Sequence, residues 1–128
     1  MAEQFLQGKT PDKAKAVCQA EDILALRKEA QAVNVKENIL VYMEDIVKST
    51  REESRYVLGA SPRALLALLR ASQARVYLQG RDFVKPDDVK AVAKQVLVHR
   101  LVLSAEYKMS RPNVQKILYK NVQLVCLF

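Results

Sequence analysis

The chain has 128 residues, of which 50% are hydrophobic and 27% are charged, with three glycines, four prolines and no tryptophan. This composition excludes a disordered chain and predicts a single folded domain over residues 1–128. So few turn residues also argue against a β-sandwich or β-barrel. The formal net charge of +7 is compatible with nucleic acid, nucleotide phosphates or an acidic protein surface as the partner.

The apolar segments and the cysteines bear on the cellular compartment of the protein. No apolar run approaches the length of a membrane span, and the first residues lack the pattern of a signal peptide, so we expect a cytoplasmic protein without membrane contact. Cys18 and Cys126 lie far apart and form no CxxC pair. They are therefore expected to be reduced, mostly buried thiols and not metal ligands.

Five segments carry apolar residues at helical spacing, and Thr10-Pro11-Asp12 has the N-cap, proline and acid that start a further short helix, which together predict an all-α bundle of about five to six helices. In chain order, the predicted helices span residues 10–17, 21–33, 36–50, 61–78, 86–103 and 112–122. The apolar positions with this spacing are Ile23, Leu26, Ala30 and Val33; Ile39, Met43, Ile46 and Val47; Val89, Val92, Ala93, Val96 and Leu103; and Val114, Ile117, Leu118 and Val122. No stretch alternates with period two for long enough to predict a sheet, and residues after about 122 form a loosely defined tail.

Proline and glycine mark the ends of the helix predicted over 61–78. Ser61 is a suitable N-cap and Pro62 fits the first helical position, where its missing N–H costs nothing. Gly80 follows the last apolar residue and favours a C-terminal cap. Arg63 then lies in the first turn, where a cation opposes the helix dipole at a cost of about 0.3–1 kcal/mol.

This unfavourable arginine makes the start of the helix a candidate anion site, because helix N-termini bind phosphate well. A helical projection places Arg63, Ala67, Arg70 and Ala74 opposite the leucine face of Leu65, Leu68, Leu69 and Val76. The arginine face either contacts something anionic or is a solvated face whose arginines pair with nearby acids.

The chain carries no catalytic motif of its own. Gly8-Lys9-Thr10 matches the end of a phosphate-binding loop, but that loop needs a glycine five positions earlier, where this chain has Glu3. No hydrophobic strand ends in the acidic pair that holds magnesium, so we expect no ATP hydrolysis by this chain alone. His99 is the single histidine and is expected to bond a backbone carbonyl near its helix end or to pack between helices. Tyr42, Tyr77 and Phe83 are expected to be core or helix-packing residues and not platforms for base stacking.

Several blocks of residues stand in a fixed order at regular separations. They are Gly59-Ala60-Ser61-Pro62-Arg63-Ala64, Leu68-Leu69, Ala71-Ser72-Gln73-Ala74, Gly80-Arg81-Asp82-Phe83-Val84, Pro86-Asp87-Asp88-Val89 and Val96-Leu97-Val98-His99-Arg100-Leu101. Upstream, Ile23-Leu24-Ala25-Leu26, Ile39, Tyr42, Ile46-Val47 and Thr50-Arg51 keep the same order. Together these blocks resemble the lid domain of MoxR-family AAA+ ATPases over about residues 5–120.

The resemblance implies a function for the arginine in the Gly-Ala-Ser-Pro-Arg segment. In that family it is the sensor 2 arginine, which reaches from the lid to the terminal phosphates of the nucleotide, and here it falls on Arg63. Ser61, Pro62 and Arg70 are the candidates for supporting nucleotide or interface contacts. No catalytic residue and no metal ligand is expected in the lid itself.

The resemblance also implies partners. A separate N-terminal AAA+ core domain would bind ATP and Mg²⁺, and the parent protein would be an ATP hydrolase that forms a chaperone-like hexamer. Neighbouring subunits and a protein with a von Willebrand factor A domain are the expected contacts. ATP and Mg²⁺ are not expected to bind the lid alone.

Two positions depart from the family pattern, and one alternative function stays open. Lys85 and Ala20 stand where a capping Ser or Thr is typical, which weakens each helix start by about 1 kcal/mol. The alternative is a small basic helical domain that binds nucleic acid, supported by the net charge of +7 and the face of Arg63 and Arg70. Against it, this face offers no stacking aromatic and few base-reading groups.

Overall fold

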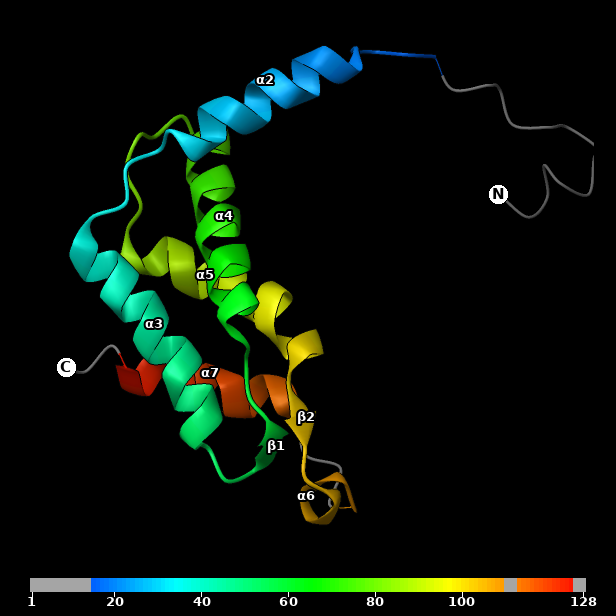
Figure 1. Ribbon diagram of the computed structural model, residues 1–128, viewed down its shortest axis with the longest axis vertical. Helices are drawn as coiled ribbons and strands as arrows, with labels where there is room; N and C mark the ends of the chain where they lie inside the picture. The colour runs from blue at the N-terminus through cyan, green and yellow to red at the C-terminus, as the bar shows by residue number, and fades with distance from the viewer. Residues whose placement is uncertain (1–14, 110–112, 126–128) are drawn as a thin grey trace, which may run out of the picture.

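The computed structural model describes residues 15–109 and 113–125 of the chain. These residues form six α-helices, one 3₁₀ helix and a two-stranded sheet, which confirms the all-α class (Figure 1). The helices are α2 (Ala20–Gln31), α3 (Glu37–Glu52), α4 (Pro62–Leu78), α5 (Pro86–Leu97), α6 (Ala105–Met109) and α7 (Val114–Val125). The 3₁₀ helix η1 spans Val98–Arg100, and the strands are β1 (Tyr56–Leu58) and β2 (Val102–Leu103).

The core lies where α3, α4, α5 and α7 meet. Helix α4 packs against α5, which crosses it in Figure 1, while α3 packs against α4 on one side and α7 on another. The largest fully buried apolar side chains come from all four helices: Met43, Ile46, Leu68, Val76, Val89, Leu97 and Leu118. Full burial of each such side chain contributes about 1.5–3 kcal/mol before conformational entropy is subtracted, so these residues hold the bundle together.

The predicted apolar faces of α3 and α7 are confirmed. Ile39, Met43, Ile46 and Val47 are buried on α3, and Ile117, Leu118 and Val122 are buried on α7, with Val114 half-buried. On α4 the buried face is rotated slightly from the projection. Leu68 and Val76 are buried as expected, but Leu65 and Leu69 are half-buried, while Ser72 is fully buried and donates to the carbonyl of Leu68 (2.8 Å).

The helix predicted over 86–103 is too long, because its last part forms a strand. Helix α5 ends at Leu97 and passes through η1, after which β2 pairs with β1 in antiparallel register, Tyr56 opposite Leu103. Leu103 is buried as expected, but from this strand and not from the helix. The seven-residue spacing between Val96 and Leu103 imitates two helical turns, and only the pairing with distant residues reveals the strand.

The N-terminal part differs more from the sequence prediction. The start of the helix predicted over 10–17 lies outside the described residues, and residues 15–19 are not helical. The N-cap of α2 is Gln19 and not Ala20, and its N–H donates to the Asp22 carboxylate (2.8 Å). Cys18 is an exposed free thiol, so its expected burial is wrong, while Cys126 lies outside the described residues.

The C-terminal part contains one helix that the spacing did not predict. Helix α6 is a single short turn after β2, and Lys108 N–H donates to the carbonyl of Ser104 (3.0 Å). Pro112, the expected start of the last helix, lies outside the described residues, and α7 continues to Val125 into the segment expected to be a loose tail. Within the described ranges, no helix is long and apolar enough to cross a membrane.

Candidate functional site

The first turn of α4 has the features of an anion site. Ser61 is the N-cap, in extended conformation (φ −79°, ψ 165°), and Pro62 takes the first helical position, both as predicted. The Ser61 hydroxyl makes no capping hydrogen bond, and the first turn contains no acidic residue. The positive end of the helix dipole is therefore not offset by a local carboxylate, which favours a bound anion.

Thr50 and Arg51 hold the segment before α4 against the end of α3. The N–H of Ala60 donates to Thr50 Oγ1 (3.0 Å), and Arg51 Nε donates to the Ala60 carbonyl (2.8 Å). Thr50 is fully buried, and its hydroxyl donates to the carbonyl of Val47 (2.7 Å). Both backbone groups of Ala60 are thus fixed to α3, which sets where α4 begins.

Gly59 is required by the same close approach. A Cβ at this position would lie 2.7 Å from both Arg51 Cα and the Thr50 carbonyl oxygen, so any side chain would push the segment away from α3. The sequence reasoning identified Gly59, Thr50 and Arg51 only as parts of the resemblance. Their contacts join residues nine or ten positions apart, and no local pattern predicts such contacts.

Arg63 is exposed in this first turn, and no hydrogen bond or ion pair joins it to another described residue. Arg70 is also exposed, but its Nη1 donates to Gln73 Oε1 (3.1 Å). The two arginines lie seven positions apart, about 10 Å along the axis of α4. The expected pairing of this face with nearby acids is not seen among the described residues, and Arg63 is the arginine with its donors available.

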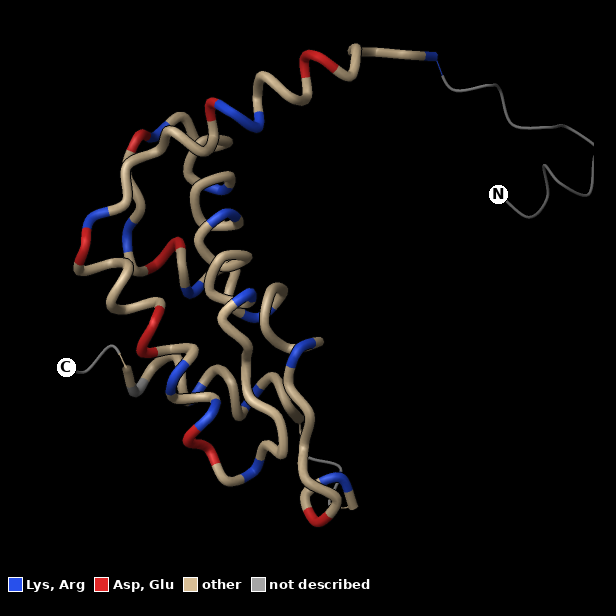
Figure 2. Tube along the Cα trace, viewed as in Figure 1, with Lys and Arg blue, Asp and Glu red and all other residues tan. Residues whose placement is uncertain are grey.

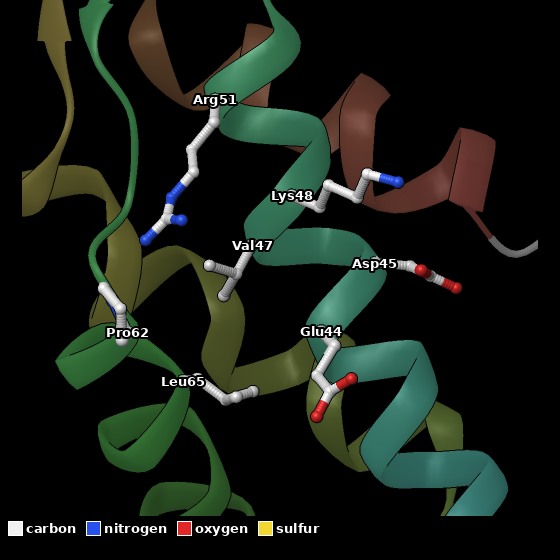
Figure 3. A pocket seen from close by; sticks show the side chains of 7 residues that line it. All are labelled: Glu44, Asp45, Val47, Lys48, Arg51, Pro62 and Leu65. Carbon is white, nitrogen blue, oxygen red and sulfur yellow. The ribbon is translucent and has the colours of Figure 1, made fainter.

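A groove of about 460 Å³ runs between α3 and the start of α4 (Figure 3). It is lined by Glu44, Asp45, Val47, Lys48, Arg51, Pro62 and Leu65. Figure 3 shows the Arg51 side chain extending from α3 toward Pro62, while Glu44 and Asp45 lie at the other end. The groove thus combines two carboxylates with two cations, Lys48 and Arg51, so its lining carries no net charge that would select an anion along α3.

Charges of both signs are mixed over most of the described surface. In Figure 2, α3 carries both acidic and basic residues, whereas α4 carries arginines and no acidic residue. Helices α2, α3 and α5 each carry both acidic and basic residues, so the basic residues are not concentrated on one of the described helices, as they are in many nucleic-acid-binding domains. This distribution favours a localised anion contact on α4.

Comparison with known proteins decides the family. Residues 48–120 match the model of the AAA lid domain family. The chain belongs to this family. The match includes Thr50, Arg51 and the whole of α4, so the site described above lies inside it.

Individual relatives confirm the resemblance of this lid to MoxR-family AAA+ ATPases. The chaperone MoxR1 of Mycobacterium tuberculosis is 31% identical over 132 residues, which cover 96% of this chain and 35% of MoxR1. The uncharacterized protein YeaC of Bacillus subtilis is 41% identical over 88 residues, 69% of this chain and 28% of YeaC. The crystal structure of a candidate ATPase from Cytophaga hutchinsonii superposes with a TM-score of 0.76 at 29% identity, over 80% of this chain and 34% of that one. The lid spans about a third of the length of these proteins.

The tyrosines, Phe83 and His99 singled out in the sequence lie away from the first turn of α4. The Tyr42 hydroxyl donates to the carbonyl of Val122 (3.4 Å), and the Tyr77 hydroxyl bonds the Glu29 carboxylate, so both link helices as predicted. Phe83 is 41% exposed beneath the Lys85 ammonium, so it is not a core residue. His99 is exposed on η1, and no group of three or more potential ligands among the described residues can hold a metal.

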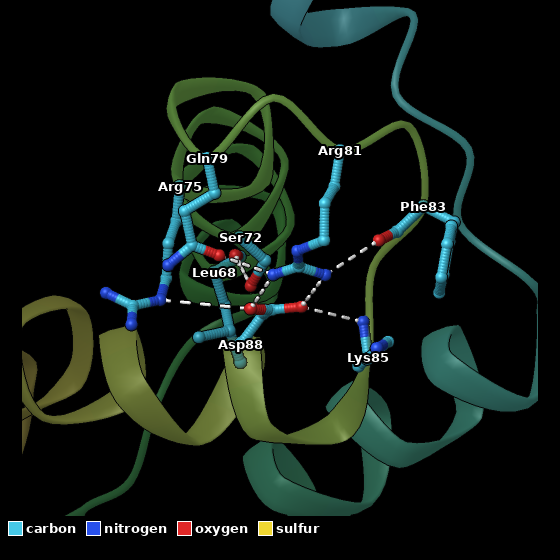
Figure 4. Close-up of polar contacts among 8 residues, drawn as sticks. All are labelled: Leu68, Ser72, Arg75, Gln79, Arg81, Phe83, Lys85 and Asp88. Atoms are coloured by element: carbon cyan, nitrogen blue, oxygen red, sulfur yellow. Dashed lines mark hydrogen bonds and ion pairs between the residues drawn. The ribbon is translucent and has the colours of Figure 1, made fainter.

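A buried carboxylate at the start of α5 bonds the connection between α4 and α5 (Figure 4). Asp88, in the first turn of α5, accepts bonds from Arg81 Nη2 (2.5 Å) and Nη1 (3.0 Å) and from the N–H of Lys85 (2.9 Å). Arg75 Nε lies 3.9 Å from the same carboxylate. Burial raises the pKa of Asp88, but the bonds from Arg81 and Lys85 and the charges of Arg81 and Arg75 outweigh it and lower the pKa overall.

Asp88 also compensates for the absence of a capping side chain at Lys85. The N-cap of α5 is Lys85, whose side chain has no hydrogen-bond acceptor, and the Asp88 carboxylate satisfies the Lys85 N–H from within the helix. The cost expected from the departure at Lys85 is therefore offset by this reciprocal bond.

Proposed function

We propose that this lid senses the terminal phosphates of ATP through Arg63 and couples hydrolysis to subunit motion in a MoxR-type AAA+ ATPase. The observation that carries the proposal is the state of Arg63. It lies in an acid-free first turn, is exposed, and has no partner among the described residues. A cation in this position is unfavourable unless an anion occupies the helix start.

The guanidinium of Arg63 offers a planar fork of donors that matches phosphate oxygens. Ala60 is bonded to α3 through both its N–H and its carbonyl, so a pull on the first turn of α4 is passed to α3. The lid would then turn as a unit when the phosphate is present or lost, which is the kind of domain motion that nucleotide switches use.

The lid would act within a larger protein, since its relatives are about three times as long. A separate core domain would hold ATP with Mg²⁺, whose charge neutralises the phosphates during hydrolysis. We further propose that the parent assembles into a hexamer in the cytoplasm, contacts a protein with a von Willebrand factor A domain, and does chaperone-like work. The name of MoxR1 as a chaperone supports the last point.

ATP turnover of the full-length ATPase tests the role of Arg63. Arg63→Ala should bind Mg-ATP at saturating concentration but hydrolyse it at least about tenfold more slowly, a loss of about 1.4 kcal/mol in transition-state stabilisation. Arg63→Lys keeps the positive charge but lacks the planar set of donors, so its hydrolysis rate should lie between those of the wild type and Arg63→Ala. Lys116→Ala, which removes an exposed cation from α7, is the matched control. Turnover of Arg63→Ala equal to that of the control would remove Arg63 from the mechanism.

A further inference from the structure

Helix α2 leaves an apolar face uncovered. It lies across the C-terminal end of α4 (Figure 1), and none of its residues is buried. Ile23 and Leu26 are 54% and 47% exposed, and Leu78 at the facing end of α4 is 84% exposed. A 12-residue helix is marginal in water without tertiary packing, so this face is suited to a further contact.

A groove of about 570 Å³ lies between the two helices. Its lining comes from both: Ile23, Leu26, Arg27, Ala30, Gln31, Arg70, Ala71, Gln73, Ala74, Tyr77 and Leu78. Most of these side chains are apolar, and the alanines leave room for the side chains of a bound segment. The groove therefore has the shape and surface that an amphipathic helix fills in helix-in-groove recognition.

Hydrogen bonds across the groove hold it open in a fixed shape. Gln73 is buried on α4, and its Nε2 donates to the carbonyls of Gln31 (3.1 Å) and Val33 (2.9 Å) at the end of α2. Tyr77 on α4 bonds Glu29 on α2. These contacts fasten the C-terminal end of α2 to α4, so the groove exists before any partner binds.

The charge of the groove indicates the chemistry of its partner. Arg27 and Arg70 are its ionic residues, and no carboxylate lines it. Neither arginine forms an ion pair with a described carboxylate, and Arg70 bonds only the neutral Gln73 side chain. A partner segment with carboxylates beside its apolar face would complement both arginines.

We propose that this groove docks an acidic amphipathic helix of a partner protein, with its apolar face on α2 and α4 and its carboxylates on Arg27 and Arg70. The inference goes beyond phosphate sensing and does not depend on it, because Arg63 does not line the groove. A second copy of this chain fits less well, since two molecules of net charge +7 repel each other.

Peptide binding to the 128-residue chain tests the proposal. The probe is a fluorescent 18-residue helical peptide with leucines along one face and glutamates beside them, and binding is measured by anisotropy and mapped by amide NMR. The expected result is saturable binding with shifts centred on residues 23–31 and 70–78. Arg27→Glu/Arg70→Glu should weaken it at least tenfold, and a peptide with lysine in place of glutamate should bind the double variant more tightly than the wild-type chain.

Controls separate the groove from the general positive charge. Lys94→Glu/Lys116→Glu lowers the net charge equally on helices outside the groove, and its affinity should change less than twofold at 0.15 M salt. Circular dichroism checks folding, and Arg27→Glu alone serves if the double variant unfolds. No saturable binding, equal weakening by both double variants, shifts centred elsewhere, or a dimer that buries the groove would each overturn the proposal.

Discussion

Asp88 and Arg63 lie in the first turns of neighbouring helices, and their opposite charges interact oppositely with the helix dipole. Asp88 at the start of α5 has the sign that a helix N-terminus favours, and it accepts three hydrogen bonds. Arg63 at the start of α4 has the opposite sign and bonds no described residue. The first residue stabilises the fold, whereas the second fits a role in binding, because a bound anion would offset its cost.

Asp88 gives the lid a defined dependence of stability on pH. Because its pKa is lower in the folded lid than in the unfolded chain, its contribution to stability is present above the unfolded value of about 3.9. That contribution is lost as the pH falls through the lower folded pKa. At pH 7, Asp88→Asn should reduce the free energy of unfolding by about 1–3 kcal/mol, with the difference shrinking toward pH 3.

Urea denaturation at several pH values measures this difference. Asp87→Asn is the matched control, since Asp87 is the preceding residue, its side chain is 88% exposed, and it pairs with the exposed end of Lys90 at 3.3 Å. It should change the free energy of unfolding by less than about 0.5 kcal/mol at every pH. Equal losses in the two variants would show that the Asp88 contacts do not stabilise the lid.

For single residues, local sequence preferences predict the helix start at Ser61 to Arg63 but not the contacts of Thr50 and Arg51. The position of Ser61, Pro62 and Arg63 at a helix start follows from N-cap and proline preferences, which act within one turn. The bonds of Thr50 and Arg51 to Ala60 depend on how α3 and α4 pack. Such long-range contacts leave no periodic signal in the sequence, so their role could be found only in the structure.

Gly59 and Gly80, in the connections before and after α4, are glycines for different physical reasons. Substitutions at the two positions can distinguish these reasons. Gly59→Ala should cost about 1–3 kcal/mol because its Cβ meets the backbone of α3, and Gly59→Asn should cost at least as much. Gly80 has open space around it but a φ of +68°, so Gly80→Ala should cost about 1 kcal/mol. Asn tolerates this conformation, so Gly80→Asn should be nearly neutral.

Chemical denaturation of the four glycine variants makes the comparison. Asparagine should keep the free energy of unfolding near that of the wild type at position 80 but not at position 59. A stable Gly59→Asn lid would mean that the segment before α4 can move away from α3, and the mechanical link proposed between Arg63 and α3 would then be lost.

Apolar spacing predicts a helix well where one face of it is buried in the core. It fails where strand pairing ends a helix, and it cannot show whether an apolar face is covered. Helices α3 and α7 keep their predicted faces because burial repeats every three to four residues. Helix α5 ends early because Val102 and Leu103 pair with β1, a contact between distant residues. In α2 the apolar spacing predicted a helix correctly, but its face is uncovered, since spacing cannot show what lies opposite.

Across the whole molecule, α4 connects the two proposed contact regions. Arg63 lies in its first turn, and the apolar groove lies along its second half, beside α2. Helix α4 is packed on α5 in the core, and the segment just before it is fixed to α3 through Ala60. A phosphate at one end and a partner helix at the other would therefore act on one rigid unit, so each could influence the binding of the other.

The most direct test of phosphate sensing compares nucleotide affinities of the full-length ATPase with and without Arg63. Calorimetry with ADP and with a non-hydrolysable ATP analogue, both with Mg²⁺, isolates the terminal phosphate. The account predicts that Arg63→Ala weakens binding of the analogue about tenfold, equivalent to about 1.4 kcal/mol, and leaves ADP affinity unchanged. Equal effects on the two nucleotides, or no effect on either, would contradict the claim that this lid reads the terminal phosphate through Arg63.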